Sequence, residues 1–221
     1  MHIRRKPWAR PELAACRFYV PDPVEHRGRW GEEFAQRAPL HLELGCGKGG
    51  FLSALAPEHP ELNFLGVDIN SDVLGLAKRK LEAAYRERGL EPDNVRILSW
   101  DIERIGMMLS PEDRVERIYI NFCNPWPKRA QQKKRLTHTR QLLSYAAFLK
   151  PGGELRFKTD DDGLFEDSLV YLEGAGYRVT FLTRNLHASG FEGNIPTEHE
   201  RMFSDMGIPI KFCIARLERQ P

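Results

Sequence analysis

Apolar residues form seven short runs along this 221-residue chain, and several are followed by apolar positions at helical spacing. The clearest helical pattern covers residues 73–85, directly after one of the runs. Short apolar strands that alternate with amphipathic helices are typical of an α/β domain with a mostly parallel sheet. The predicted strands are residues 40–44, 63–67, 94–99, 117–122, 153–159, 177–182 and 210–217.

Three other segments carry weaker patterns. Residues 102–109 and 131–148 are predicted as further helices. Residues 1–37 are rich in proline and arginine and only weakly periodic, which predicts a basic, partly irregular arm that orders on a partner, with a short helix near residues 31–37. Residues 38–221 then form the main domain.

A glycine-rich turn follows the first strand and opens a helix. Gly45, Gly47 and Gly50 satisfy the spacing G-x-G-x-x-G, in which bare backbone can approach a nucleotide-like ligand at the carboxyl edge of a parallel sheet. Glu43 lies on the strand just before the turn, where its charge would repel a pyrophosphate. The sequence therefore favours S-adenosylmethionine over a dinucleotide, while a tight turn without any ligand stays open.

Acidic residues recur at or just after the ends of three successive predicted strands. Asp68 follows the second strand, where a carboxylate can grip ribose hydroxyls, and Asp101 follows the third, where it can accept from an adenine amino group. Either residue could instead cap the next helix. Because Glu43 lies at the same edge, the three carboxylates are expected to converge on one crevice.

The net charge of +2 hides an uneven distribution. Residues 118–153 contain no Asp or Glu but are rich in Lys and Arg, which indicates a polyanionic partner. Two prolines stiffen the loop around Trp126, whose ring is a plausible platform for a base. The expected nucleic-acid patch comprises Trp126, Arg129, Lys133, Lys134 and Arg135.

Two acidic segments admit both a structural and a functional interpretation. One of Asp160, Asp161 and Asp162 is expected to cap the helix that follows the fifth strand. Residues 197–200 read T-E-H-E, which has the form of a capping box but could equally contact a substrate.

The composition excludes several classes of protein. No apolar run is long enough for a membrane helix, and the first ten residues lack the apolar centre of a signal peptide, so we expect a cytoplasmic protein. The four cysteines are far apart, which favours reduced thiols, and neither they nor the seven histidines have the spacing of a metal site.

Taken together, these segments resemble the bacterial tRNA (guanine-N7)-methyltransferases of the TrmB type. The matching motifs are LELGCGKGGF, GVD, NFCNPWPKR, LKPGGELRFKTD and TEHE, in family order from about residue 40 onward. The resemblance implies a class I, Rossmann-like fold with a seven-stranded, mostly parallel sheet and helices on both faces. It also implies methyl transfer from S-adenosylmethionine to guanine N7 in the variable loop of tRNA.

The same resemblance suggests roles for individual residues. Cofactor binding is expected from Glu43, Gly45, Gly47, Asp68, Asp101 and Asn124, and substrate binding from Lys128, Asp160, Thr197, Glu198, His199 and Glu200. Asn124 is also the expected catalytic residue, although the family usually has Asp there. Asp68 likewise stands where many relatives carry Glu.

Three alternatives stay open at the level of sequence. Asn124-Pro125 resembles the start of an exocyclic-amine methyltransferase motif, although here the aromatic residue precedes the second proline. The glycine spacing alone would fit a nicotinamide oxidoreductase, and a non-catalytic tRNA-binding relative would explain Asn124. The sequence leaves the oligomeric state undecided between monomer and homodimer.

Overall fold

The computed structural model describes residues 5–218 and divides into two compact units, Met1–Asp113 and Arg114–Pro221. Residues 1–4 of the predicted arm and the last three residues lie outside the described part. The rest of the predicted arm, residues 5–37, falls within the first unit. Each unit is considered by itself below.

Three parallel strands form the centre of the first unit, in the order β3-β2-β1. They are β1 (Leu40–Leu44), β2 (Asn63–Asp68) and β3 (Val95–Ser99). All five residues of β1 are buried, including His41 and Glu43 between its three leucines. The register pairs Leu44 with Val67 and Asp68 with Ser99, so the ends of the three strands lie at one edge.

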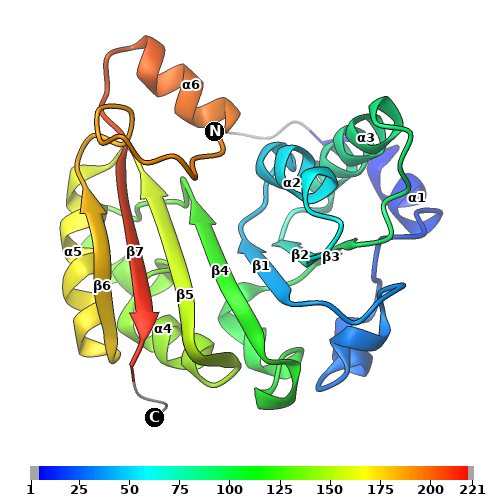
Figure 1. Ribbon diagram of the computed structural model, residues 1–221, viewed down its shortest axis with the longest axis horizontal. Coiled ribbons are helices and arrows are strands. Elements are labelled where there is room, and N and C mark those ends of the chain that lie inside the picture. Colours follow the sequence, from blue (N-terminus) through cyan, green and yellow to red (C-terminus); the bar gives the residue numbers. More distant parts are fainter. Residues whose placement is uncertain (1–4, 219–221) are drawn as a thin grey trace. The chain divides into compact units, whose positions relative to one another are not determined.

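Helices and part of the arm cover these strands. The α-helices are α1 (Ala9–Ala14), α2 (Gly50–Leu55) and α3 (Ser71–Glu87), and 3₁₀ turns include η2 (Trp30–Glu32) and η4 (Ile102–Met107). Asn70 caps α3 by accepting from the backbone N–H of Asp72 at 2.9 Å. Figure 1 shows α1 beside α3.

The described part of the arm packs against the rest of the first unit, and its ordering on a partner stays a prediction. Leu13, Phe18 and Trp30 are almost fully buried, and the Trp30 indole donates to the Met108 carbonyl at 2.7 Å. Gly75 lets α1 approach α3, because a Cβ there would lie 2.6 Å from the Ala9 Cβ. The helix expected near residues 31–37 is only the short turn η2. The helix expected over residues 102–109 is the 3₁₀ helix η4, which ends at Met107 and has non-helical backbone at Arg104.

Four strands form the second unit, in the order β4-β5-β7-β6. They are β4 (Val115–Asn121), β5 (Leu149–Thr159), β6 (Tyr177–Thr183) and β7 (Lys211–Leu217). β4 and β5 are parallel, and β7 runs antiparallel to both β5 and β6. Residues 5–218 therefore hold the seven predicted strands, with β5 beginning earlier than expected.

The helices of the second unit are α4 (Thr139–Ala146), α5 (Asp162–Gly174) and α6 (Glu198–Asp205), with the 3₁₀ helix η6 (Arg129–Lys134). Figure 1 shows α4 and α5 on one side of the four strands and α6 at the end to which β4 and β5 point. The single helix predicted for residues 131–148 is wrong, because Arg135 and His138 have extended backbone that separates η6 from α4.

Within residues 5–218, no helix has the length and apolar character that crossing a membrane requires. The same residues contain no group of three His, Cys, Asp or Glu side chains placed to hold a metal ion. All four cysteines are free thiols, and burial raises the pKa of both Cys123 and Cys213 to about 12, so they stay protonated near neutral pH.

Candidate active site

The glycine turn after β1 is closely bound to the end of β2. Gly45 and Cys46 both donate their backbone N–H to the Val67 carbonyl, at 2.8 and 3.0 Å. Gly45, Gly47 and Gly49 all have positive φ, which favours glycine. A Cβ on Gly49 would also lie 2.9 Å from the Ala77 Cβ, so this glycine lets the turn approach α3. At Gly47 an added Cβ would meet only the Gly45 carbonyl oxygen, at 3.9 Å, so here the positive φ and not a close approach favours glycine.

Asp68 links this turn to the start of α3. Its Oδ2 accepts from the Gly47 N–H at 3.0 Å and its Oδ1 from the Asn70 N–H at 2.9 Å. Burial raises the pKa of Asp68, although these backbone donors partly oppose the rise. Each carboxylate oxygen keeps a further lone pair, so Asp68 can still accept from a ligand diol while it holds the turn.

The other two predicted acids differ in exposure. Glu43, on β1, is only 2% exposed, whereas Asp101 is half-buried and accepts from the Glu103 N–H at 3.0 Å. Asp101 is thus the N-cap of η4, the structural alternative that the sequence left open. Capping occupies one lone pair of one oxygen and leaves the second oxygen for a ligand. Ile69, which sequence reasoning missed, is 68% exposed directly after Asp68.

In the second unit, the loop after β4 carries two residues with unusual backbone. Phe122 and Trp126 have φ values of 53° and 42°, although neither is glycine. Asn124 lies between them on the surface, and its Oδ1 accepts from the Trp126 N–H at 3.1 Å. The Lys134 ammonium lies 5.2 Å from the centre of the Trp126 ring, a cation–π contact that joins the loop to η6.

Arg135 does not belong to an exposed patch, contrary to the sequence prediction. Its side chain is 4% exposed, and it donates to the Pro125 carbonyl at 2.7 Å and to an Asp167 oxygen at 2.5 Å. The Arg135 backbone is extended at the end of η6, and the guanidinium is directed into the interior of the unit. Arg135 therefore fixes the loop that carries Asn124.

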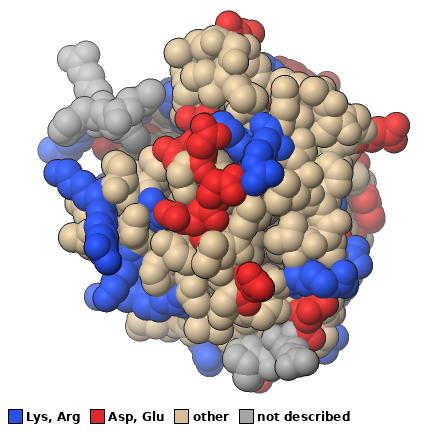
Figure 2. Space-filling model, turned by 90° about the vertical axis from the view of Figure 1, so that its left-hand side faces the viewer, with Lys and Arg blue, Asp and Glu red and all other residues tan. Residues whose placement is uncertain are grey.

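The remaining cations of this segment are exposed. Lys128, Arg129 and Lys133 point into solvent, and no carboxylate among residues 5–218 pairs with them. The face with β6 and α5 is different, because acidic side chains gather near its middle with basic ones beside them (Figure 2). There Glu166 and Arg184 form an ion pair at 2.8 Å. The loop and η6 therefore carry a run of exposed positive charge that no neighbouring carboxylate balances.

The three acids after β5 have separate places. Asp161 caps α5, with its Oδ1 accepting from the Leu164 N–H at 2.6 Å, and Asp162 pairs with Lys211 at 2.8 Å. Asp160 is half-buried, and its backbone carbonyl accepts from the Lys211 ammonium at 2.9 Å. Its carboxylate has no partner within residues 5–218, so it is the one of the three carboxylates with no structural contact there.

The T-E-H-E segment begins α6. Thr197 accepts from the Glu200 N–H at 3.1 Å, which confirms the N-cap interaction of the predicted capping box. Glu198 and His199 are exposed, and the His199 ring stacks on Phe122 with 6.1 Å between ring centres. Glu200 is fully buried, so in this structure it faces the interior of the unit.

A buried ion pair that sequence reasoning missed explains the burial of Glu200. The Lys158 ammonium, on β5, lies 2.7 Å from Glu200 Oε2 and also donates to Asn194 Oδ1 at 2.8 Å. The other Glu200 oxygen contacts His187 Nε2 at 2.8 Å and the Asn194 amide at 2.5 Å. Burial alone would raise the pKa of Glu200, but Lys158 and the other donors lower it overall. The network ties α6 to β5.

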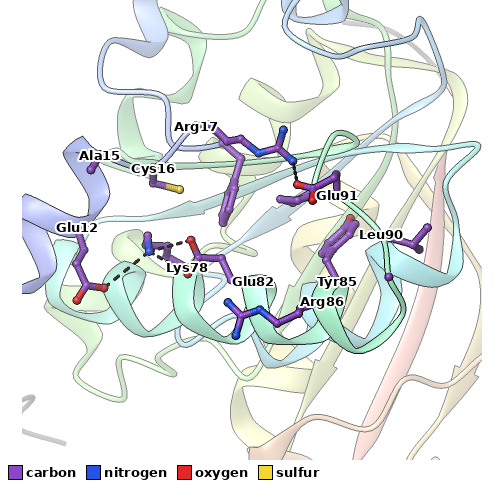
Figure 3. Close-up of a pocket in the computed structure, with 13 residues that line it drawn as sticks. Glu12, Ala15, Cys16, Arg17, Lys78, Glu82, Tyr85, Arg86, Leu90 and Glu91 are labelled. Atoms are coloured by element: carbon purple, nitrogen blue, oxygen red, sulfur yellow. Dashed lines mark hydrogen bonds and ion pairs between the residues drawn. The ribbon is translucent and has the colours of Figure 1, made fainter.

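A cavity of about 550 Å³ lies in the first unit between the end of α1 and the second half of α3 (Figure 3). Lys78 in its wall pairs with Glu82 at 2.8 Å, and Arg17 pairs with Glu91 at 2.5 Å. Burial raises the pKa of the Cys16 thiol, which also lines the cavity. Because these charges are matched and the thiol is protonated, the cavity lacks the chemistry of an active site.

Known proteins match both the sequence and the fold. A family described as "Putative methyltransferase" matches residues 37–213. A tRNA (guanine-N(7)-)-methyltransferase from Ruminiclostridium cellulolyticum is 59% identical over 221 residues, covering 100% of this chain and 94% of the relative. The enzyme of the same name from Clostridium beijerinckii is 55% identical, covering 97% of this chain and 98% of the relative.

The chain belongs to the tRNA (guanine-N7)-methyltransferase family. The fold agrees, since the crystal structure of the 16S rRNA methyltransferase KamB matches with a TM-score of 0.58 at 16% identity, covering 82% of this chain and 88% of that one. The predicted class I methyltransferase fold and the predicted family are both confirmed.

Each unit by itself carries groups that are available to a ligand. In the first unit, the Asp68 carboxylate, held beside the glycine turn by the Gly47 N–H, fits a ligand with a ribose diol. In the second, Asn124, Asp160 and the exposed cations from Lys128 onward are the groups available to a nucleic acid. No local signal distinguishes Lys158 as a buried charge, because Glu154 and Arg156 alternate with it along the same strand.

Proposed function

We propose that this chain transfers the methyl group of S-adenosylmethionine to guanine N7 in the variable loop of tRNA. The observation that carries the proposal is the full-length 59% identity to a relative that bears this name. The exposed cations of the loop and η6 support a polyanionic substrate, and no observation favours an oxidoreductase. A cytoplasmic location follows from the same proposal.

The first unit would bind the cofactor. Asp68 accepts from the ribose diol and Asp101 from the adenine amino group, each with a lone pair beyond those used for backbone N–H groups. Glu43, at the end of β1, faces the amino-acid end. Exposed Ile69 offers an apolar surface to the adenine ring. When bound, S-adenosylmethionine supplies an electrophilic methyl group on a sulfonium.

The second unit would hold the guanine. Guanine N7 has an exposed lone pair and no proton, so its attack on the methyl group needs no general base. Orientation is then the main task of the protein, and holding reactants in line is worth about 7–11 kcal/mol in favourable cases. Asn124, on a loop fixed by Arg135, contacts the base, while Asp160 and the exposed residues Glu198 and His199 contact neighbouring parts of the RNA.

A methyl-incorporation experiment tests this function. Labelled S-adenosylmethionine is incubated with unmodified tRNA transcripts that have or lack a guanosine in the variable loop, and the labelled nucleoside is identified. We expect 7-methylguanosine, from the guanosine-containing transcript only. Label on an exocyclic amine would support the amine-methyltransferase alternative, and binding of both ligands without transfer would support a non-catalytic protein.

The exposed cations give a second prediction. Replacing both Lys128 and Arg129 with alanine is expected to weaken tRNA binding and to reduce the slope of log K against log salt by about 1–2, because each lost phosphate contact changes the slope by about 0.7–0.9. Fluorescence titrations across a salt series measure the slope. Arg184→Ala is the matched control, since Arg184 is exposed but paired with Glu166. Equal slopes for the double variant and this control would contradict the phosphate contacts.

A further inference from the structure

The amide of Asn124 has a fixed orientation in the loop after β4. The Trp126 backbone N–H, 3.1 Å from one end of this amide, can only donate a hydrogen bond. The end that faces it must therefore be the oxygen, Oδ1. The loop itself is held by Arg135, whose Nε donates to the Pro125 carbonyl at 2.7 Å.

The second atom of the amide is then the nitrogen, Nδ2, which carries two N–H donors and no lone pair. No protein partner for Nδ2 is present among residues 5–218, and Asn124 is exposed. An aspartate at this position would use one oxygen for the Trp126 N–H and present a second oxygen, an acceptor. Asn124 therefore presents a donor where an acidic residue would present an acceptor.

Guanine offers opposite chemistry at two neighbouring edges. The edge that contains N7 also contains the O6 acceptor, whereas N1–H and the 2-amino group on the adjacent edge are donors. A hydrogen-bond donor of the protein can therefore bind O6 on the N7 edge, but it cannot bind N1–H or the 2-amino group on the adjacent edge. We propose that Asn124 binds the target guanine by donating from Nδ2 to O6, next to the N7 that is methylated. This proposal rests on the proposed function.

The hydrogen bond from Nδ2 to O6 positions the base but contributes little to stabilising the charge that develops on the ring during methyl transfer. Methylation places positive charge on the purine ring, which makes O6 a poorer acceptor, so a bond from Nδ2 does not strengthen as the reaction proceeds. Asn124 is thus a specificity residue that reads the N7 and O6 edge. The other possibility is that the remaining lone pair of Oδ1 accepts from N1–H.

Exchanging the base at the target position separates these two contacts. A ligated transcript carries either guanosine or 2,6-diaminopurine there, and the second base replaces O6 with an amino donor and N1–H with a lone pair. Single-turnover rates of N7 methylation are measured for the native protein and Asn124→Asp. The ratio of the two rates is compared between proteins, which cancels the intrinsic reactivity of each base.

We expect Asn124→Asp to reduce the preference for guanosine at least tenfold, because the new oxygen accepts from the amino group where the native amide lost its partner. Asn185→Asp is the matched control, since Asn185 is also exposed and its Oδ1 also accepts a backbone N–H, from Ala188 at 3.3 Å. Its preference should equal that of the native protein.

The other outcomes are equally definite. An increased preference for guanosine in Asn124→Asp would show that position 124 accepts from N1–H, and an unchanged preference would show that Asn124 does not touch the base. Either result overturns the proposal but leaves the proposed function intact. A native protein that forms no 7-methylguanosine at all would instead overturn the proposed function, and this inference with it.

Discussion

Replacing Lys158 with methionine is expected to lower the free energy of unfolding by about 3–5 kcal/mol, because removal of one partner leaves the other charge buried and unpaired. The Lys158 and Glu200 side chains are 4% and 0% exposed, so water cannot solvate the remaining carboxylate. Urea titration monitored by tryptophan fluorescence measures the loss. Lys150→Met is the matched control, since Lys150 lies on the same strand and pairs with Glu116, but both side chains are about one third exposed. The control should cost no more than about 1 kcal/mol.

A double variant shows whether the loss comes from the unpaired charge. Lys158→Met combined with Glu200→Leu removes both charges, and we expect it to recover a large part of the stability lost in Lys158→Met. The polar groups of Asn194 and His187 lose a partner in this variant, so recovery is incomplete. Equal stabilities of the single and double variants would show that packing, and not the uncompensated charge, accounts for the loss.

The same pair predicts acid sensitivity. The pKa of Glu200 is lower in the folded protein than its ordinary value, so the unfolded chain binds a proton more readily. The stability from this carboxylate is present above its ordinary pKa and is lost as the pH falls through the lowered value. In the double variant this contribution is absent, and the unfolding free energy should fall less steeply over that acidic range.

The strands and the glycine turn were predictable because they depend on local patterns. β1 has leucine at every second position and is followed by glycines that the turn requires at positive φ, so both the element and its end are encoded within about ten residues. Capping was predictable for a similar reason, since Asn70 and Thr197 each bond to a backbone N–H only two or three residues away.

The predictions of secondary structure failed where contacts between residues far apart in the sequence determine the local backbone. The segment 131–148 has a helical composition, but Arg135 bonds to Pro125 and to Asp167, and these contacts impose the extended backbone that interrupts the helix. The arm looks irregular in sequence because its few apolar residues have no regular period. Phe18 and Trp30 are nevertheless buried against residues far along the chain, which no local pattern reveals.

In the candidate site, too, features set by local sequence were predictable, and features set by distant contacts were not. The positions of the strand ends were predictable from spacing, whereas the contacts of similar side chains near them were not. Asp160, Asp161 and Asp162 are identical and consecutive, yet one caps a helix, one pairs with Lys211 and one is available to a ligand. Likewise, Glu198 and Glu200 differ only in the direction they face, which is set by Lys158.

Asp68→Ala is expected to weaken S-adenosylmethionine binding roughly 100-fold, a change of about 2.7 kcal/mol. The substitution removes the acceptor proposed for the ribose diol and also the two contacts that hold the Gly47 and Asn70 N–H groups. Isothermal titration calorimetry measures the affinity. Asp93→Ala, which removes an exposed aspartate of the same unit that pairs with Arg17, is the control for loss of one charge and should bind as the native protein does.

Two further measurements show that the effect is local. Affinity for tRNA should change little in Asp68→Ala, because the proposed RNA contacts belong to the second unit. Asp68→Glu keeps a carboxylate and should retain most of the affinity that alanine loses.

Since burial raises the pKa of Asp68, cofactor binding by the native protein should begin to weaken on acidification at a higher pH than it would with an ordinary aspartate. Unchanged cofactor affinity in Asp68→Ala would exclude this residue from the cofactor site, and the glycine turn would then have to bind without it.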